Sequence, residues 1–156
     1  MQPFPHRYTA SATAGESGEV VLEGPGLPSL ASEPPLEFDG PGDKWSPETL
    51  LLAAVADCLV LTFRAIARAS QLRWSHLECS ADGTVDRIDR VTRFTELTVH
   101  ATLHVPAGTS EERALRLLQK AEETCLVTRS LNATSHLDAR IEVEEGEDEG
   151  EGAATG

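Results

Sequence analysis

The chain contains one long predicted helix, from Ser46 to about Ser70, that restricts the folds open to it. Ser46 can accept hydrogen bonds from the first free amides, Pro47 is tolerated in a first helical turn, and Glu48 complements the positive end of the helix dipole. Apolar residues are dense as far as Leu61, and only beyond it do two arginines mark an exposed stripe. The first half is therefore predicted to be buried on most sides, as a central helix would be.

Before this helix, the sequence predicts a β-hairpin over Arg7 to Glu23 and then a long loop. Two short extended segments flank Gly15 to Gly18, whose glycines can adopt the positive φ of a tight turn. The Pro- and Gly-rich segment Gly24 to Gly42 follows and favours short extended pieces at most. Loops of this length inside a compact domain often lie at functional or oligomeric surfaces.

After the helix, the chain changes to the alternation that is typical of strands. Residues 74–81 alternate weakly, whereas residues 94–105 alternate well and place one apolar face toward a core. The turn-rich segments 82–84 and 87–90 are predicted to connect these two strands.

The last third of the sequence predicts two helices followed by a strand. Thr109 to Glu112 fits a capping box, and the residues after it form a helix with one apolar stripe. Thr124 can cap a second, short helix from Cys125 to about Leu131, and residues 136–143 alternate as a closing strand. The order of elements predicts an α+β fold with antiparallel pairing.

Size and charge narrow the classes of function. A chain of 156 residues is expected to form one domain with one core. The formal net charge is -13, and seven of the acids lie between residues 142 and 151. We therefore predict a folded domain over residues 1–143 and an acidic disordered tail over residues 144–156. Phosphate backbones and anionic lipids would repel such a chain, so neither nucleic acid nor a membrane is expected as a partner.

The predicted location is cytoplasmic. The apolar stretch Leu50 to Phe63 is 14 residues long and contains Asp57, and a bilayer needs ~20 residues. The N-terminal residues contain no apolar run that resembles a signal peptide. In a reducing compartment the three cysteines are expected to be free, catalytic or metal-bound rather than structural disulfides.

Two of the cysteines are the main candidates for chemistry. Cys58 lies 12 residues beyond Ser46, too far for the helix dipole to act on it, and by itself is interpreted as a small core residue. Cys125 opens a helical segment, where unpaired amides and Arg129 would activate its thiol; a buried small residue is the alternative. Cys79 lies in a strand and is predicted to belong to the core.

A metal site and a bound cofactor are not expected. The cysteines form no Cys-x-x-Cys motif, and among histidines only His76 lies within four residues of a cysteine. His100 and His104 share a strand face but would stand ~13 Å apart, too far to bind one ion. Phosphate-binding and dinucleotide-binding fingerprints are missing from the sequence.

Two segments together resemble a known family. Ser46-Pro-Glu-x-Leu-Leu-Leu-Ala-Ala-x-Ala-x-Cys58 and Ala-Glu-Glu-Thr-Cys125-Leu-Val-Thr-Arg-Ser-Leu resemble the OsmC/Ohr family of osmotically inducible protein C and organic hydroperoxide resistance proteins. The resemblance extends from about Arg7 to Val143. It implies an α+β, OsmC-like fold with an antiparallel sheet, a long central helix, and an intertwined homodimer with two active sites at its interface.

The resemblance also implies a function and roles for three residues. Known members are thiol peroxidases that act without a metal or bound cofactor, on organic hydroperoxides or hydrogen peroxide, and are reduced by a dithiol. Cys58 matches the peroxidatic cysteine, which becomes a sulfenic acid. Cys125 matches the resolving cysteine, which forms a disulfide with it. Glu48 matches the carboxylate that orients the family's catalytic arginine.

That arginine has no direct match. The hairpin carries Gly15-Glu-Ser-Gly18, and Lys44 is the cation of the loop before the helix. Lys44, and less directly Arg7, are therefore the candidates for a thiolate-stabilising cation. One alternative is a member with little peroxidase activity that binds a small hydrophobic molecule or a partner at the dimer cleft. A second is a structural protein with inert cysteines.

Overall fold

The computed structural model describes residues 1–146 and divides into two units. Unit 1 comprises Met1–Leu51, and unit 2 begins at Leu52. Helix α1 (Pro47–Ala69) begins in unit 1 and continues into unit 2, and its bounds confirm the predicted helix. Most of the predicted acidic tail, residues 147–156, lies outside the described residues, and residues 144–146 are exposed coil.

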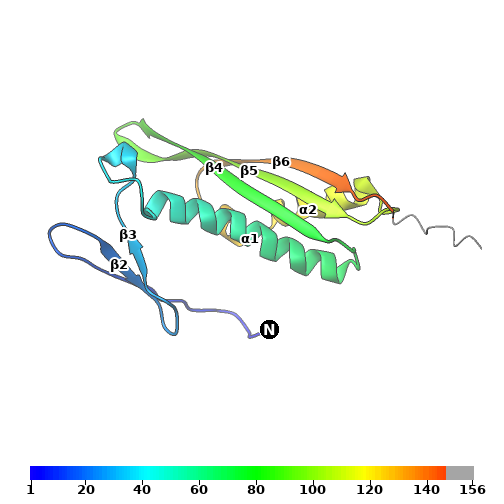
Figure 1. Ribbon diagram of the computed structural model, residues 1–156, viewed down its shortest axis with the longest axis horizontal. Helices are drawn as coiled ribbons and strands as arrows, with labels where there is room; N and C mark the ends of the chain where they lie inside the picture. Colours follow the sequence, from blue (N-terminus) through cyan, green and yellow to red (C-terminus); the bar gives the residue numbers. More distant parts are fainter. Residues whose placement is uncertain (147–156) are drawn as a thin grey trace, which may run out of the picture. The chain divides into compact units, whose positions relative to one another are not determined.

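Unit 1 contains a three-stranded antiparallel sheet whose strands β2 and β3 are labelled in Figure 1. Its strands are β1 (Ser11–Thr13), β2 (Val20–Glu23) and β3 (Leu30–Ser32), followed by a 3-10 turn, η1 (Leu36–Phe38). The predicted hairpin is confirmed by the pairing of β1 with β2. At the start of α1, the Thr49 amide donates to Ser46 Oγ (3.2 Å) and the Ser46 amide donates to Thr49 Oγ1 (2.9 Å). This reciprocal cap explains why the helix begins here.

Unit 2 contains the second sheet, in the order β4-β5-β6. Its strands are β4 (His76–Ile88), β5 (Val91–Val105) and β6 (Thr134–Val143). The predicted antiparallel pairing is confirmed for β4 and β5, but β6 runs parallel to β5. The helices between β5 and β6 form the crossover that a parallel pair requires, and a crossover of this kind is not evident from strand alternation alone.

The hairpin between β4 and β5 is longer than the sequence predicts. Residues 82–84 are not a turn but part of β4. A Cβ at Gly83 would lie 2.7 Å from the Phe94 ring and 2.9 Å from Leu52, so glycine is required here by packing. The turn falls at Asp89 and Arg90, within the predicted segment 87–90, and their φ values of 50° and 67° fit a tight two-residue hairpin turn.

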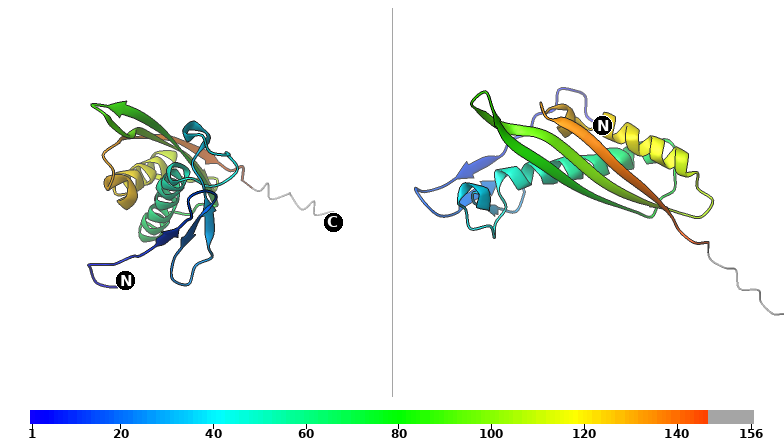
Figure 2. Two further views of the ribbon diagram at one scale, coloured as in Figure 1. Left: turned by 90° about the vertical axis from the view of Figure 1, so that its left-hand side faces the viewer. Right: turned by 90° about the horizontal axis from the view of Figure 1, so that it is seen from above.

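Helix α2 (Glu111–Glu123) and the unit 2 part of α1 cover one face of the sheet, as Figure 2 shows. The N-cap of α2 is Ser110, one residue later than the predicted Thr109, and its Oγ accepts from the Arg113 amide at 3.2 Å. The core between these layers consists of buried aliphatic residues and one phenylalanine. It contains Val55, Leu59, Phe63, Ala67, Leu72, Leu97, Val99, Ala101, Leu103, Val105, Ala114, Leu118 and Ala121.

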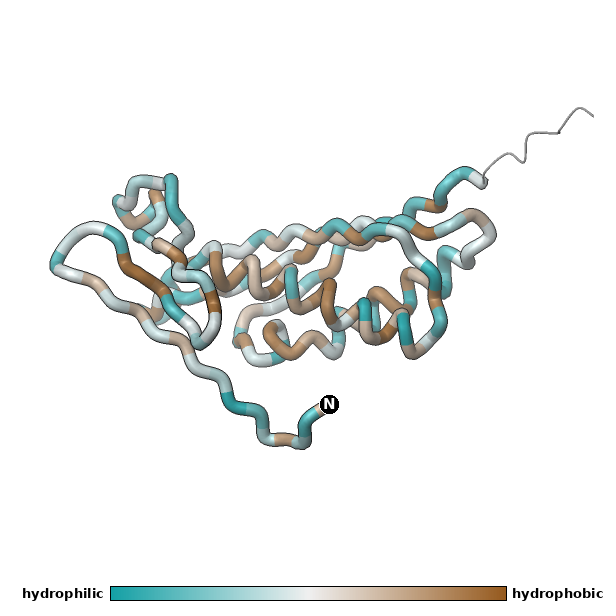
Figure 3. The backbone as a smooth tube through the Cα atoms, turned by 60° about the horizontal axis from the view of Figure 1, so that its bottom comes forward, coloured by the Kyte–Doolittle hydropathy of each residue, from teal (hydrophilic) through white to brown (hydrophobic). Residues whose placement is uncertain are grey.

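Only one stripe of α1 is buried within the chain. Its buried side chains are Val55, Leu59, Phe63 and Ala67, which recur every four residues, whereas Leu61 is 51% exposed. The prediction that the first half is buried on most sides is therefore wrong for the single chain, because a sheet covers only one side of a helix. Hydrophobic residues also lie outside this stripe, such as Leu50 and Leu61, and the backbone coloured by hydropathy shows hydrophobic residues recurring along the chain (Figure 3).

Helix α1 has 23 residues, more than the 14-residue apolar stretch by which its length is judged from the sequence. By length and composition it could cross a membrane. One such helix is weak evidence for a membrane span, because the core helix of a soluble protein passes the same test, and four side chains of α1 belong to the core.

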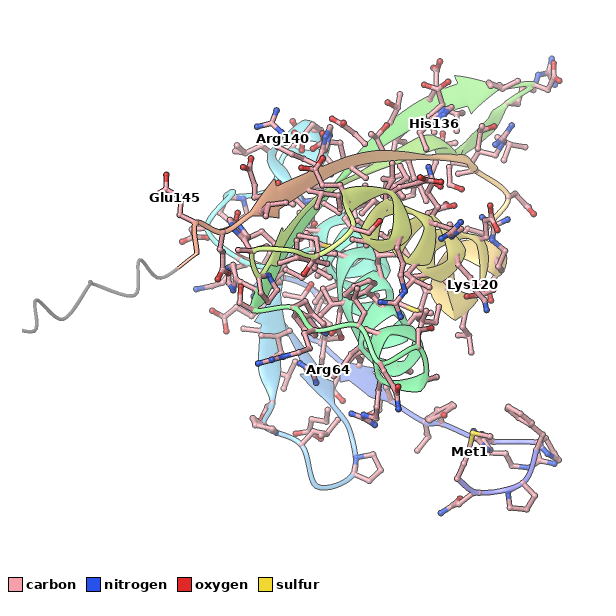
Figure 4. The ribbon with its side chains drawn as sticks, turned by 90° about the vertical axis from the view of Figure 1, so that its right-hand side faces the viewer. Met1, Arg64, Lys120, His136, Arg140 and Glu145 are labelled. Carbon is pink, nitrogen blue, oxygen red and sulfur yellow. The ribbon has the colours of Figure 1, made fainter. Side chains whose placement is uncertain are left out.

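The face of the sheet that points away from the helices is polar. Figure 4 shows His136 and Arg140 projecting from β6 on this side. At its centre, the His100 ring lies between two carboxylates, with Nδ1 3.1 Å from Asp138 Oδ2 and Nε2 2.8 Å from Asp82 Oδ2. Hydrogen bonds to Asp138 and then Asp82 raise the pKa of His100. The ring thus links the three strands, and it forms an ion pair with the carboxylates when it is protonated.

Candidate active site

Cys58 and Cys125 come together within unit 2. Cys58 lies half-buried on α1, and Cys125 is buried at the N-cap of α3 (Leu126–Arg129). Both are free thiols, and they lie close enough to influence each other's ionisation. Thr62, one turn further along α1, places its Oγ1 3.9 Å from Cys58 Sγ. The structure therefore brings together two cysteines that are 67 positions apart in the sequence.

The end of α2 sets the position of Cys125. Thr124 is the C-cap of α2 rather than the predicted cap of α3, and its Oγ1 donates to the Lys120 carbonyl at 2.8 Å. The chain then turns directly into α3, and the Cys125 carbonyl accepts the first helical bond from the Arg129 amide at 2.9 Å. Amides in the first turn of a helix have no partner inside it, so those after Cys125 are available to a nearby anion.

The pKa of Cys58 is lowered from its ordinary value. Partial burial acts to raise it, but the surrounding groups that favour the thiolate outweigh burial. In order of effect, these are the Val127 amide, the Cys125 thiol, the Thr62 hydroxyl and the Leu126 amide. A thiolate at Cys58 is therefore stabilised by hydrogen-bond donors that unit 2 itself provides.

The pKa of Cys125 is shifted the other way. Burial raises it most, and the neighbouring Cys58 raises it further, against donors from Thr128 that lower it. Local sequence reasoning favours the reverse, an activated Cys125 and a Cys58 without local activation, and these pKa directions contradict it; the alternative for Cys125, a buried small residue, agrees with its burial. The physical reason is that the amides of α3 act on a thiol from another helix, which no local pattern reveals.

Cys79 does not take part in this pair. It packs against the core from β4, and burial raises its pKa to about 11. This agrees with the predicted core role. Among residues 1–146, no three His, Cys, Asp or Glu side chains are grouped as metal ligands.

The charged residues that are predicted for the site belong to unit 1. Glu48 lies in the first turn of α1, and its Oε2 atom is buried without a hydrogen-bond partner among the described residues. Lys44 Nζ lies 3.3 Å from Glu19 Oε1, and this hydrogen bond is the main cause of its raised pKa. Arg7 is exposed near the N-terminus. Their action on the thiolate stays a prediction.

Unit 1 also contains a cavity of about 500 Å³ with a mainly apolar lining. Leu22, Pro34, Phe38 and Glu48 are among the residues that line it. The unpartnered carboxylate oxygen of Glu48 is thus next to apolar side chains, where a hydrogen-bond donor would be favourable.

Thr62 is a site residue that the sequence reasoning missed. A signal was available, because residues four apart on a helix lie on the same face, and Thr62 follows Cys58 by four. The amides of Leu126 and Val127 carry no such signal, since their contribution depends on how α3 packs against α1.

Comparison with known proteins gives one family and a shared fold. The model of the OsmC-like protein family matches residues 40–149. The uncharacterized protein YmaD of Bacillus subtilis is 27% identical over 144 residues, which cover 90% of this chain and 96% of YmaD.

Solved structures of other proteins have the same fold. An OsmC-like protein of unknown function from Vibrio cholerae superimposes with a TM-score of 0.78 at 16% identity, covering 86% of this chain and 99% of that one. An organic hydroperoxide resistance protein, OsmC, from Legionella pneumophila gives a TM-score of 0.71 at 22% identity, covering 90% and 100%. These similarities confirm the predicted OsmC-like α+β fold.

Proposed function

The chain is a member of the OsmC-like protein family, and we propose that it is a thiol-dependent peroxidase that reduces organic hydroperoxides. The observation that carries this proposal is the pairing of two free thiols with opposite pKa shifts. Attack on a peroxide needs a thiolate, and resolution needs a second thiol nearby that keeps its proton until then. Cys58 and Cys125 meet these two requirements respectively.

In the first step, the Cys58 thiolate attacks the distal oxygen of the hydroperoxide. A sulfur–oxygen bond forms, the oxygen–oxygen bond breaks, and the departing alkoxide takes up a proton to leave as an alcohol. Sulfur is oxidised to the sulfenic acid by two electrons, which reduce the peroxide. The Val127 and Leu126 amides, with Thr62, hold the thiolate in place for this attack.

In the second step, the Cys125 sulfur attacks the sulfenic acid sulfur. A disulfide bond forms, and the hydroxyl group leaves as water with the proton of the Cys125 thiol. An external dithiol then reduces the disulfide in two exchange steps and becomes oxidised itself, restoring both thiols. We propose a cytoplasmic protein, because that compartment maintains such reductants.

Organic hydroperoxides are the proposed substrates because Cys58 lies on an apolar helix. Leu61 is 51% exposed on α1, and Leu126, next to Cys125, is 68% exposed. These side chains favour a hydroperoxide with an apolar body over hydrogen peroxide. The Legionella pneumophila relative in fold is named an organic hydroperoxide resistance protein, which supports the same class.

We further propose that the protein acts as a homodimer. Apolar residues on α1 outside its buried stripe would remain in water in a single chain, and a second copy would cover them. Sedimentation equilibrium should give twice the mass of the chain. A monomer at micromolar concentration would contradict this part of the proposal.

Counting free thiols tests the peroxidase directly. The reduced wild-type protein should lose two of its three thiols together after one equivalent of cumene hydroperoxide. Cys58→Ser should lose none rapidly, and Cys79→Ser, the matched control, should still lose two. Retention of all three thiols in the wild type would refute the proposal.

One observation favours a second candidate function, that of a binding protein with little peroxidase activity. Lys44 is paired with Glu19, and Glu48 has an unpartnered oxygen beside an apolar cavity in unit 1. A small hydrophobic molecule with a hydrogen-bond donor would suit that cavity. Retained thiols together with a raised melting temperature in the presence of such a molecule would favour this candidate.

A further inference from the structure

A polar cluster connects three elements around Cys125. Ser135 Oγ donates to Glu122 Oε1 at 2.9 Å, and Arg129 Nη2 lies 3.4 Å from the same carboxylate oxygen and 3.4 Å from Ser135 Oγ. Glu122 comes from the last turn of α2, Arg129 ends α3, and Ser135 lies at the start of β6. One carboxylate oxygen therefore joins the two ends of the segment 124–133, which carries Cys125.

The position of Glu122 makes this cluster stronger than an ordinary surface ion pair. The Glu122 side chain is only 14% exposed, whereas that of Arg129 is 52% exposed. A partly buried carboxylate loses its interaction with water and depends on the donors around it. An exposed pair, by contrast, contributes little to holding a structure in place. The bond from Ser135 is the part-buried and shorter one, so it should contribute most.

We propose that Glu122 is a positioning residue for the thiol pair. Its carboxylate fixes the segment 124–133, so that the Leu126 and Val127 amides stay directed at Cys58 and Cys125 stays beside it. Glu122 touches neither sulfur nor substrate in this role. As a catalytic contribution the inference rests on the proposed peroxidase, but the positioning of the amides does not depend on it.

A positioning role and a direct effect of charge predict opposite changes in the stability of the Cys58 thiolate. Replacing Glu122 by Gln removes a negative charge and frees Arg129, and both changes would favour a nearby thiolate by direct electrostatics. Cys125 is a titratable group beside Cys58 in unit 2, and it is unchanged by the substitution. If Glu122 positions the amides, its replacement should instead disfavour the Cys58 thiolate, because the donors become misaligned.

The direction of this change is measured by the rate at which iodoacetamide alkylates Cys58 over a series of pH values, followed by peptide mass spectrometry. We expect Glu122→Gln and Ser135→Ala to alkylate Cys58 about three- to tenfold more slowly than wild type at pH 7, as for loss of a hydrogen bond to a charged group. Glu123→Gln is the matched control, because it removes the same charge from the neighbouring, exposed residue of α2. Loss of this exposed and screened charge should not slow the alkylation of Cys58.

The double variant and the peroxide assay complete the test. Glu122→Gln combined with Ser135→Ala should be no slower than the worse single variant, since both break the same bond. Equal or faster alkylation of Cys58 in Glu122→Gln and in Ser135→Ala would overturn the inference. If Glu122→Gln does not fold, Ser135→Ala alone decides by the same criterion. Slower alkylation in a protein that consumes no peroxide would support positioning and refute only the proposed peroxidase.

Discussion

The two units differ in the hydrogen-bond partners that surround their candidate functional residues. In unit 2, the Cys58 thiol has donors from Thr62, Cys125 and the start of α3 around it. In unit 1, Glu48 has an unpartnered carboxylate oxygen, and Lys44 is paired with Glu19. The lowered pKa of Cys58 is therefore explained by hydrogen-bond donors of unit 2, whereas the action of the charged residues of unit 1 on the thiolate stays a prediction.

The largest effect should come from removing the resolving thiol. In Cys125→Ser, cumene hydroperoxide should still oxidise Cys58, but the product should stop at a sulfenic acid that dimedone traps. Turnover with a dithiol should fall on the order of a hundredfold, because an external thiol must replace one held in place. Full turnover in Cys125→Ser would show that the pair in unit 2 is not the redox couple. Cys79→Ser should behave as wild type.

The variant Glu48→Gln tests whether unit 1 contributes to peroxide reduction without affecting the ionisation of Cys58. We expect the rate of peroxide reduction to fall about tenfold, as for loss of a charged hydrogen-bond partner, while the pH dependence of Cys58 alkylation stays the same. Glu37→Gln, an exposed acid of the same unit, is the control. A changed alkylation profile in Glu48→Gln would mean that unit 1 also sets the ionisation of Cys58.

Thr62→Val should have a smaller effect, confined to unit 2. Valine keeps the shape of threonine but removes the hydroxyl 3.9 Å from Cys58 Sγ. Because that hydroxyl lowers the pKa of Cys58, alkylation at pH 7 should slow about two- to fivefold, as for one weak hydrogen bond. Thr62→Ser keeps the hydroxyl and should restore the rate. An unchanged rate in Thr62→Val would remove this residue from the site.

The smallest effect concerns the open face of the unit 2 sheet. Asp138 and Asp82 raise the pKa of His100, so its stabilising contribution is present at low pH and is lost as the pH rises through that raised value. Wild type should therefore melt at a higher temperature than His100→Asn at about pH 5.5 and at the same temperature at about pH 9. Being exposed, this network should contribute little. A difference that grows with pH would contradict the assignment.

Sequence reasoning succeeded where the determining forces are local. The cap at Ser46 and Thr49, the buried stripe of β5 and the apolar face of α2 all follow from patterns within a few residues of each other. It failed at β6, which pairs parallel to β5, and at Gly83, which is strand rather than turn. Both depend on packing between segments that are distant in the sequence.

The same distinction between local patterns and long-range packing applies to the candidate site. The resemblance to known proteins, rather than any local pattern, identified Cys58 and Cys125 as a pair. Their relative acidity could not be read from the sequence, because the amides of Leu126 and Val127 act across the packing of two helices. Glu122 was visible only as one acid among several at the end of α2, and its contacts with Arg129 and Ser135 required the fold.

The most direct measurement is the pH dependence of alkylation for each cysteine of the reduced wild-type protein. Tryptic cleavage places Cys58, Cys79 and Cys125 on separate peptides, so mass spectrometry follows each thiol independently. Cys58 should react at the lowest pH, with Cys125 and Cys79 reacting only at higher pH. Cys125 reacting at a lower pH than Cys58 would contradict the assignment of Cys58 as the activated thiol.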